Sequence, residues 1–194
     1  SLRDVIVPAV DAAIADVVMG VGDYRDFPVA PYGDPGDWTF ALRQAMTIDV
    51  AAVQAALDGL RVGGGADTAE AEVEAMYASA GNTCSTGAGF GAACFRDDSH
   101  PIIVIVTDAP SHNGTDPANN YDSSVTARSW SETMTLLNSH DVKILGAAVR
   151  ISIFPAEGRP DLEAAARATG SFTRAGDPTV YPVTGGAVSD TVVG

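Results

Sequence analysis

Pro101-Ile-Ile-Val-Ile-Val-Thr-Asp-Ala-Pro-Ser-His112 is the stretch that indicates the fold class of this 194-residue chain. Residues 102–106 form an uncharged, β-branched run that is too short for a helix and typical of a strand buried on both faces of a parallel sheet. The run ends in Thr107 and Asp108. We therefore expect a carboxylate at the carboxyl edge of the sheet, which is where open α/β proteins bind ligands.

Helical and strand patterns alternate along the rest of the chain. Helices are expected over 2–17 (with a kink or a late start at Pro8), 50–60 (capped by Asp49), 66–77, 123–139 and 160–170. Strands are expected over 17–24, 39–46, 142–149 and 180–183. This alternation predicts a single α/β domain over residues 1–194, doubly wound, with a mainly parallel central sheet flanked by helices.

The composition excludes several classes of protein. An apolar fraction of 46% with 19% charged residues is typical of a globular chain, and no apolar run approaches the roughly 18–20 residues of a membrane helix. The net charge of −14 argues against nucleic acid and anionic membrane partners. This acidity fits either solubility alone or cation binding by some of the 25 acidic residues.

Cys84 and Cys94 lie in a Gly-, Ser- and Ala-rich loop insertion, residues 82–96. The segment has no helical or strand period, so its cysteines could close a disulfide, and we then expect an oxidising, extracellular or cell-surface location. The alternative is two buried free thiols. Neither a CxxC spacing nor a neighbouring histidine supports zinc.

Acidic residues follow several of the predicted strands and a glycine turn. The candidate ligands are Asp26, Asp67, Thr68, Glu70 and Asp108. If the strands are neighbours, these side chains meet over one edge of the sheet, and their oxygen atoms suit Mg²⁺, Ca²⁺ or Mn²⁺ better than zinc or copper. Asp67 and Thr68 with Glu70 could instead form a capping box at the start of the next helix.

Four segments in the same order resemble a von Willebrand factor A domain, and in particular the I-like domain of integrin β subunits. They are Met19-Gly-Val-Gly-Asp-Tyr-Arg-Asp-Phe-Pro-Val-Ala-Pro-Tyr32, Thr47-Ile-Asp-Val50, Gly65-Ala-Asp-Thr-Ala-Glu-Ala71, and residues 103–112 with Asp116. The resemblance covers residues 1 to about 170. It implies a cation-dependent adhesion or recognition domain, without enzymatic activity, in which a divalent ion grips a carboxylate of a protein or polymer partner.

The same resemblance assigns ligands to two sites. Glu70 and Asp108 would hold Mg²⁺ or Mn²⁺ at the adhesion site. Asp26, Asp67 and the Ala69 carbonyl, again with Glu70, would hold a neighbouring Ca²⁺, and Thr68 is a further candidate.

The sequence departs from the family in one respect that affects the main site. It lacks the family's Asp-x-Ser-x-Ser motif and the first strand, which lies in the family between the strands expected near Val18 and Val104. A gap there would leave backbone groups unpaired in the core. We therefore expect the rest of a longer parent protein, or another source, to supply this strand.

Two other functions remain open on the sequence alone. One is a structural module that keeps the fold without a competent adhesion site. The other is a metal-dependent hydrolase in which His112 acts as general base beside Asp108. Asn113-Gly114-Thr115 matches a glycosylation sequon, although Asn-Gly is first of all a turn.

Overall fold

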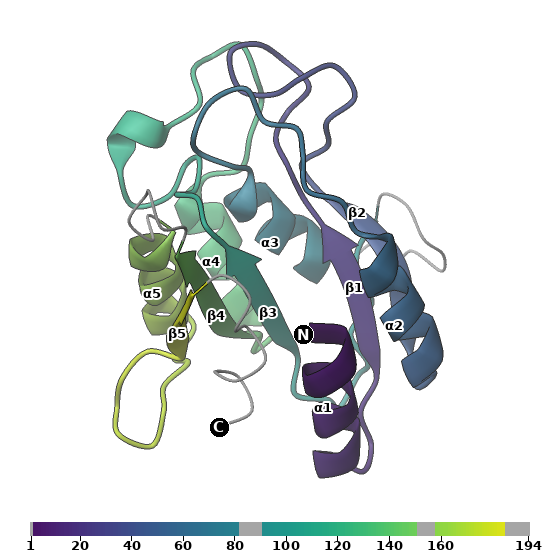
Figure 1. Cartoon of the computed structure of the whole chain (residues 1–194). Helices are drawn as coiled ribbons and strands as arrows, with labels where there is room; N and C mark the ends of the chain where they lie inside the picture. The colour runs from purple at the N-terminus through teal and green to yellow at the C-terminus, as the bar shows by residue number, and fades with distance from the viewer. Residues whose placement is uncertain (1, 82–90, 151–157, 185–194) are drawn as a thin grey trace.

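The computed structural model describes residues 2–81, 91–150 and 158–184, and it places two separate β-sheets in them (Figure 1). The first is antiparallel and consists of β1 (Met19–Asp23) and β2 (Ala41–Thr47). The second is parallel, in the order β3 (Ile102–Thr107), β4 (Lys143–Arg150) and β5 (Val180–Thr184). The prediction of a mixed α/β protein with a parallel sheet is confirmed.

Helical segments connect the strands. They are the π-helical turn η1 (Leu2–Ile6), α1 (Val7–Ala13), α2 (Val50–Gly59), α3 (Glu72–Ala80), the 3-10 turn η2 (Pro117–Asn119), α4 (Trp130–Ser139) and α5 (Arg159–Ala168). Asp49 caps α2 as predicted, because its carboxylate accepts from the amides of Ala51 and Ala52. The predicted start of α4 at residue 123 is wrong. A capping box formed by Ser129 and Glu132 makes the helix begin at Trp130.

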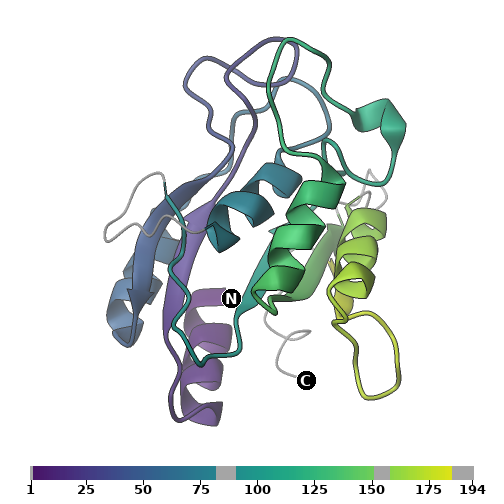
Figure 2. The same cartoon turned by 180° about the vertical axis from the view of Figure 1, so that it is seen from behind.

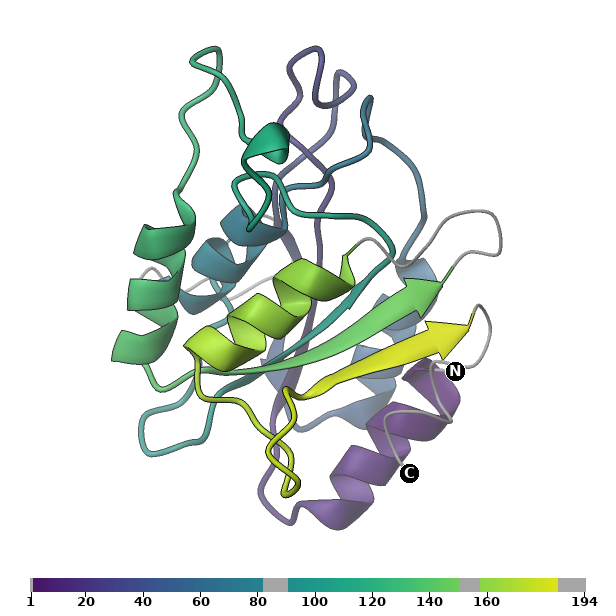
Figure 3. The same ribbon diagram turned by 90° about the vertical axis from the view of Figure 1, so that its left-hand side faces the viewer.

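Helices α3, α4 and α5 pack on the parallel sheet through one apolar core (Figures 2 and 3). Met76, Leu137 and Leu162 come from these three helices and join Ile105 and Ile144 of the sheet. A smaller core holds α1 and α2 against β1. The helices thus fix the sheet, and the connecting loops gather beyond its carboxyl end, at the top of Figure 1.

The prediction that the run 102–106 is buried on both faces is wrong. Ile102 is 50% exposed and Val104 is 46% exposed. In the described parts of the chain, β3 pairs with β4 alone, so it is an edge strand. The β-branched run indicates a strand, but it carries no information about how many neighbours that strand has.

The cysteine loop lies largely outside the described residues, and so does Cys84. Cys94 is disulfide-bonded, while the Cys84–Cys94 pairing itself stays a prediction. No helix within the described ranges combines the length and the apolarity that crossing a membrane requires.

Candidate metal centre

Backbone hydrogen bonds join three loops at the carboxyl end of the parallel sheet. The Ala71 amide donates to the Arg25 carbonyl at 2.9 Å, and the Glu70 amide donates to the Pro110 carbonyl at 2.9 Å. The His112 amide returns a bond to the Glu70 carbonyl at 2.8 Å. Segments far apart in the sequence are therefore held side by side, and the polar side chains of all three loops can meet.

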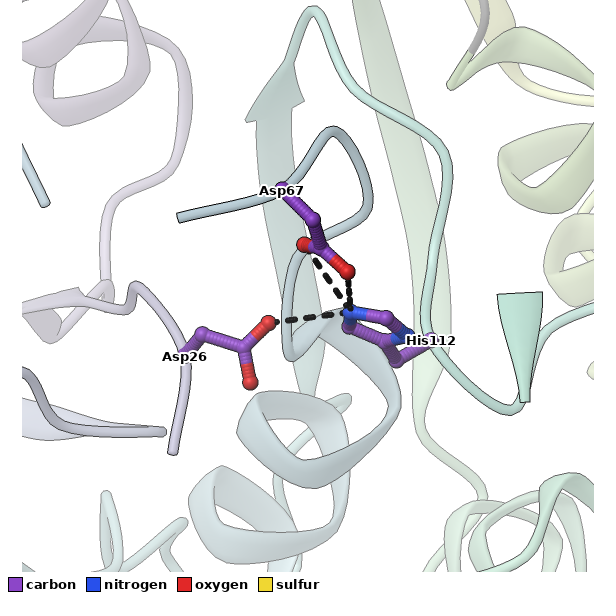
Figure 4. Close-up of side chains that lie close together, drawn as sticks. All are labelled: Asp26, Asp67 and His112. Carbon is purple, nitrogen blue, oxygen red and sulfur yellow. Dashed lines mark hydrogen bonds and ion pairs between the residues drawn. The ribbon is translucent and has the colours of Figure 1, made fainter. Parts of the chain in front are cut away.

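Asp26, Asp67 and His112 form a compact group at this point (Figure 4). One potential ligand atom from each residue lies within 4.8 Å of the other two. His112 Nε2 is 3.1 Å from Asp26 Oδ2 and 3.3 Å from Asp67 Oδ2. Asp26 is fully buried and His112 is 3% exposed, whereas Asp67 reaches the surface. This group could hold a metal ion.

The two ring nitrogens of His112 have different partners. Nδ1 lies 2.6 Å from the Asn119 carbonyl, which can only accept, so Nδ1 carries a hydrogen. Nε2 faces two carboxylates and also carries one in this arrangement. Burial opposes protonation, but the contacts with Asp26 and Asn119 and the negative charges of Asp26 and Asp67 prevail and raise the pKa of His112.

The carboxylate of Asp26 is held rigidly. Its Oδ1 accepts from the Phe27 amide at 2.6 Å and from the Tyr121 hydroxyl at 2.5 Å. The Tyr121 ring stacks on His112 with centroids 4.1 Å apart. The other oxygen, Oδ2, is buried, accepts no further hydrogen bond and points at His112 Nε2. Asp26 therefore presents to the centre of the group one oxygen whose polar neighbour is His112 Nε2.

Glu70 adds a further carboxylate oxygen nearby, Oε2, which is buried without a hydrogen-bond partner. Burial, and then the charges of Asp26, Asp37 and Asp67, raise the pKa of Glu70 to about 7. Gly65 gives its carboxylate room: with φ at +73°, a Cβ at that position would lie 2.8 Å from Glu70 Oε1.

Asp37 fixes the glycine turn that carries these residues. It is buried, and its Oδ2 accepts from the Gly65 amide at 2.9 Å and from the Asp34 amide at 2.8 Å. Arg25 Nη1 lies 3.1 Å from its Oδ1. Burial alone would raise the pKa of Asp37, but these three donors lower it. Asp37 thus stays ionised and serves the turn.

Of the other predicted ligands, Asp108 is not part of the group of Asp26, Asp67 and His112, and the roles of Thr68 and the Ala69 carbonyl stay predictions. Asp108 is exposed at the end of β3, Thr68 is exposed, and Ala69 is buried. Asp108 and Glu70 both raise the pKa of buried Tyr24, after the larger contributions of burial and Glu72. Asp108 and Glu70 therefore lie near the same buried hydroxyl, while the structure does not bring Asp108 to Asp26, Asp67 and His112.

The capping alternative for Asp67, Thr68 and Glu70 is wrong. Helix α3 begins at Glu72, and its N-cap residue, Ala71, makes no side-chain capping bond. The side chain of Asp67 faces His112 instead. The glycine turn and the hydrogen bonds of residues 70 and 71 to neighbouring loops delay the helix.

Glu72 and Asp161 belong to the support of this site and were not singled out in the sequence. Glu72 is 1% exposed, accepts from Ser111 Oγ at 3.1 Å, and its Oε1 has no partner. Burial is the main cause that raises the pKa of Glu72 to about 8. Asp161 accepts from the amides of Ser111 and Thr115 at 2.8 and 2.7 Å. The sequence alone did not indicate this role. An aspartate such as Asp161 in the first turn of a helix is common without any link to a functional site.

The structure gives His112 and Asn113 local partners. His112 Nδ1 lies against the Asn119 carbonyl and Nε2 against Asp26 and Asp67, and Asp108 is not among the partners of its ring in the described residues. A role of His112 as general base beside Asp108 stays a prediction. The Asn113 side chain donates to the Arg128 carbonyl at 2.8 Å and accepts from the Tyr121 amide at 3.1 Å. Asn113, with φ at +53°, thus serves the loop as a turn residue.

Comparison of the chain with protein-family models and with curated proteins gave no match. The chemistry of the centre is therefore argued from its donor atoms. Two carboxylates and an imidazole converge, and the imidazole donates its other N–H to a backbone carbonyl, as metal-bound histidines usually do. Asp26 Oδ2, which faces His112, and Glu70 Oε2, which accepts no hydrogen bond, fit the same interpretation.

Proposed function

We propose that this chain is a cation-dependent recognition domain of the von Willebrand factor A type, extracellular or surface-bound. The observation that carries the proposal is the orientation of His112, whose Nε2 is presented to Asp26 and Asp67 while Nδ1 is fixed by a carbonyl. A divalent ion bound there would supply a Lewis-acidic position with an exchangeable water, which a partner's carboxylate can replace.

The residues of the chain prepare the site for positive charge. In the arrangement described above, the protonated His112 lies between Asp26 and Asp67 and balances their charge. Glu70 is partly buried and held close to several other acids, and its raised pKa reflects first its burial and then the repulsion from Asp26, Asp37 and Asp67. A divalent ion would compensate more negative charge than the single proton on Nε2 does, so binding should be favourable.

The proposed site holds two neighbouring ions, as the family resemblance implies. Glu70 and Asp108 would hold Mg²⁺ or Mn²⁺ for the partner, and Asp26, Asp67, Glu70 and the Ala69 carbonyl would hold Ca²⁺. The structure suggests one addition, His112, as a ligand of the second ion. Because imidazole suits transition metals better than Ca²⁺, Mn²⁺ competes for this position in our proposal.

The proposed fold is the doubly wound arrangement of that family, with its first strand contributed by the parent protein. The free edge of β3 beside β1, in the described parts of the chain, supports this proposal. The partner would be a protein or polymer that presents a carboxylate. The competing proposal is a structural module without an open metal position, which the absent Asp-x-Ser-x-Ser motif favours.

Isothermal titration with Ca²⁺, Mg²⁺ and Mn²⁺, each followed by an acidic peptide, tests the proposed function. We expect at least one ion to bind, and we expect the peptide to bind only when that ion is present. Asp26→Asn and His112→Gln should weaken ion binding roughly tenfold or more. The matched control is Asp177→Asn, an exposed residue away from these loops.

Each result has a defined meaning. Ion binding that is unchanged in Asp26→Asn and His112→Gln would contradict the assigned ligands. Ion binding without any ion-dependent peptide binding would favour the structural module. Thermal unfolding of each variant in chelator shows whether a lost response reflects misfolding.

A further inference from the structure

Three of the eleven basic residues of this acidic chain line one surface cavity of about 380 Å³. Its lining consists of Arg25, Arg43, Arg61, Trp38, Asp23, Ala56 and Gly59. The lining thus carries an excess of positive charge in a protein whose net charge is −14. The cavity lies beside the antiparallel sheet and α2, and it shares no lining residue with the group of Asp26, Asp67 and His112.

The cavity is organised around the indole ring of Trp38. The Arg25 guanidinium lies over this ring, 4.1 Å from its centroid, and the Arg43 guanidinium lies 4.5 Å from it. Asp23 accepts from Arg43 Nε at 2.7 Å and from Trp38 Nε1 at 3.2 Å. Stacking and hydrogen bonding therefore hold two arginines in defined positions, which lowers the entropy cost of using them for binding.

Each arginine keeps donors that no described residue uses. Arg25 bonds to Asp37 through Nη1, and Arg43 bonds to Asp23 through Nε and Nη2. Arg61 bonds through Nη1 to the carbonyls of Asp58 and Leu60. A guanidinium carries five N–H donors, so donors remain on all three groups. Arg61 in addition makes no ion pair with a carboxylate within the described residues.

We infer that this cavity binds a small oxyanion-bearing molecule, through carboxylate or phosphate oxygens that accept from Arg25, Arg43 and Arg61. Guanidinium groups recognise both kinds of oxyanion with paired hydrogen bonds. Ala56 and the Trp38 ring provide apolar surface for a short carbon frame. The inference does not rest on the metal centre, and it holds whether or not a cation binds there.

Trp38 reports on the cavity, since the chain has one other tryptophan, Trp130. In the Trp130→Phe background, fluorescence is titrated with sulfate, inorganic phosphate and tricarballylate at constant ionic strength, with chelator present. We expect a saturable change with at least one probe. A stronger response to tricarballylate than to the two inorganic ions assigns a carboxylate ligand, and the reverse assigns a phosphate-like one.

Arg61→Gln should weaken the response of Trp38 roughly tenfold or more, as expected for the loss of a charge-assisted hydrogen bond. Arg61→Lys keeps the charge but loses the planar fork, so its affinity for the probe should lie between those of the wild type and Arg61→Gln. Arg96→Gln is the control, because Arg96 pairs with Asp16 away from the cavity. A response that is linear with every probe, or equal in Arg61→Gln and the control, would overturn the inference, and circular dichroism of each variant excludes unfolding as the cause.

Discussion

His112 shows how one side chain can serve either a proton or a metal ion. Its Nδ1 is committed to the Asn119 carbonyl, and its Nε2 is offered to Asp26 and Asp67. An ion that binds at Nε2 must displace the hydrogen on that nitrogen. Metal binding and protonation of His112 are therefore coupled.

We predict that ion binding at pH 6 releases about one proton from His112 and that affinity rises with pH. Because the pKa of His112 is raised, a proton competes with the metal ion for Nε2 at every pH below that raised pKa. Above it, the affinity should no longer depend on the protonation of His112. Titration calorimetry in two buffers of different ionisation enthalpy measures the released proton. His112→Gln should release fewer protons. Equal release in both proteins would show that His112 is no ligand.

Glu72 is predicted to make the apo protein less stable as the pH rises. Its pKa is about 8 in the folded state and near its usual 4.5 when unfolded. Between these values the folded state holds a proton that the unfolded state has lost, so stability present below pH 4.5 declines up to about pH 8. Glu72→Gln should flatten this decline and be more stable by a few kcal/mol above pH 8.

Urea unfolding over this pH range checks the Glu72 prediction. Glu163→Gln, a partly exposed residue of α5, serves as control and should follow the wild-type profile. Some dependence of stability on pH should persist in Glu72→Gln. The pKa values of Glu70 and His112 are also raised in the folded state, so both groups also make the protein less stable as the pH rises. An unchanged slope in Glu72→Gln would show that this carboxyl is not held neutral in the fold.

Among the elements, α5 supports the metal centre from a distance. Its first turn carries Asp161, which is 4% exposed and accepts from the amides of Ser111 and Thr115 and from the Thr115 hydroxyl. Gly114 comes so close to this carboxylate that a Cβ would lie 2.7 Å from it. The helix thus fixes the loop on which His112 lies.

Asp161→Ala should destabilise the protein by roughly 1–3 kcal/mol, because the buried amide of Ser111 and the partly buried bond from the Thr115 amide lose their acceptor. It should also weaken ion binding, although Asp161 is not a proposed ligand. Asp161→Asn keeps an acceptor oxygen and should restore part of both properties. Chemical unfolding and calorimetry measure them, with Asp177→Ala as the surface control. A stability loss with unaltered ion affinity would separate α5 from the site.

At the scale of the whole molecule, the described strands form two separate sheets, and this division leaves strand β3 with an unpaired edge. In the described chain β3 has a free edge toward the antiparallel sheet, and Ile102 and Val104, which share one face of this strand, are about half exposed. Unpaired strand edges with apolar side chains favour the addition of another strand. This arrangement is the physical basis for the proposed contribution of the parent protein.

If a parent protein supplies the proposed strand from residues before Ser1, extending the chain with them should raise the melting temperature and slow hydrogen exchange of the outward-facing β3 amides. An extension of equal length made of Gly and Ser is the control, since it adds chain but no strand. Val104→Lys should reduce the gain. Unprotected β3 amides in the extended protein would contradict the proposed strand.

Local patterns predicted the elements well where a short-range signal exists. Asp49 caps α2, and the apolar runs at residues 102–106 and 142–149 are strands, because capping and strand formation depend on nearby residues. The start of α3 was predicted too early, since bonds from Glu70 and Ala71 to other loops hold that segment out of the helix.

The order of residues along the chain was enough to predict an α/β protein with a parallel sheet and acidic loops, because strand and helix periodicity is a local property of the chain. Which acids meet was decided by folding. Asp26 and Asp67 face His112 rather than Asp108, because hydrogen bonds between loops set the positions of these side chains. Burial then raised the pKa of Glu70, and contacts with Asp26 and Asn119 raised the pKa of His112 against the effect of its burial. Both effects depend on residues far apart in the sequence.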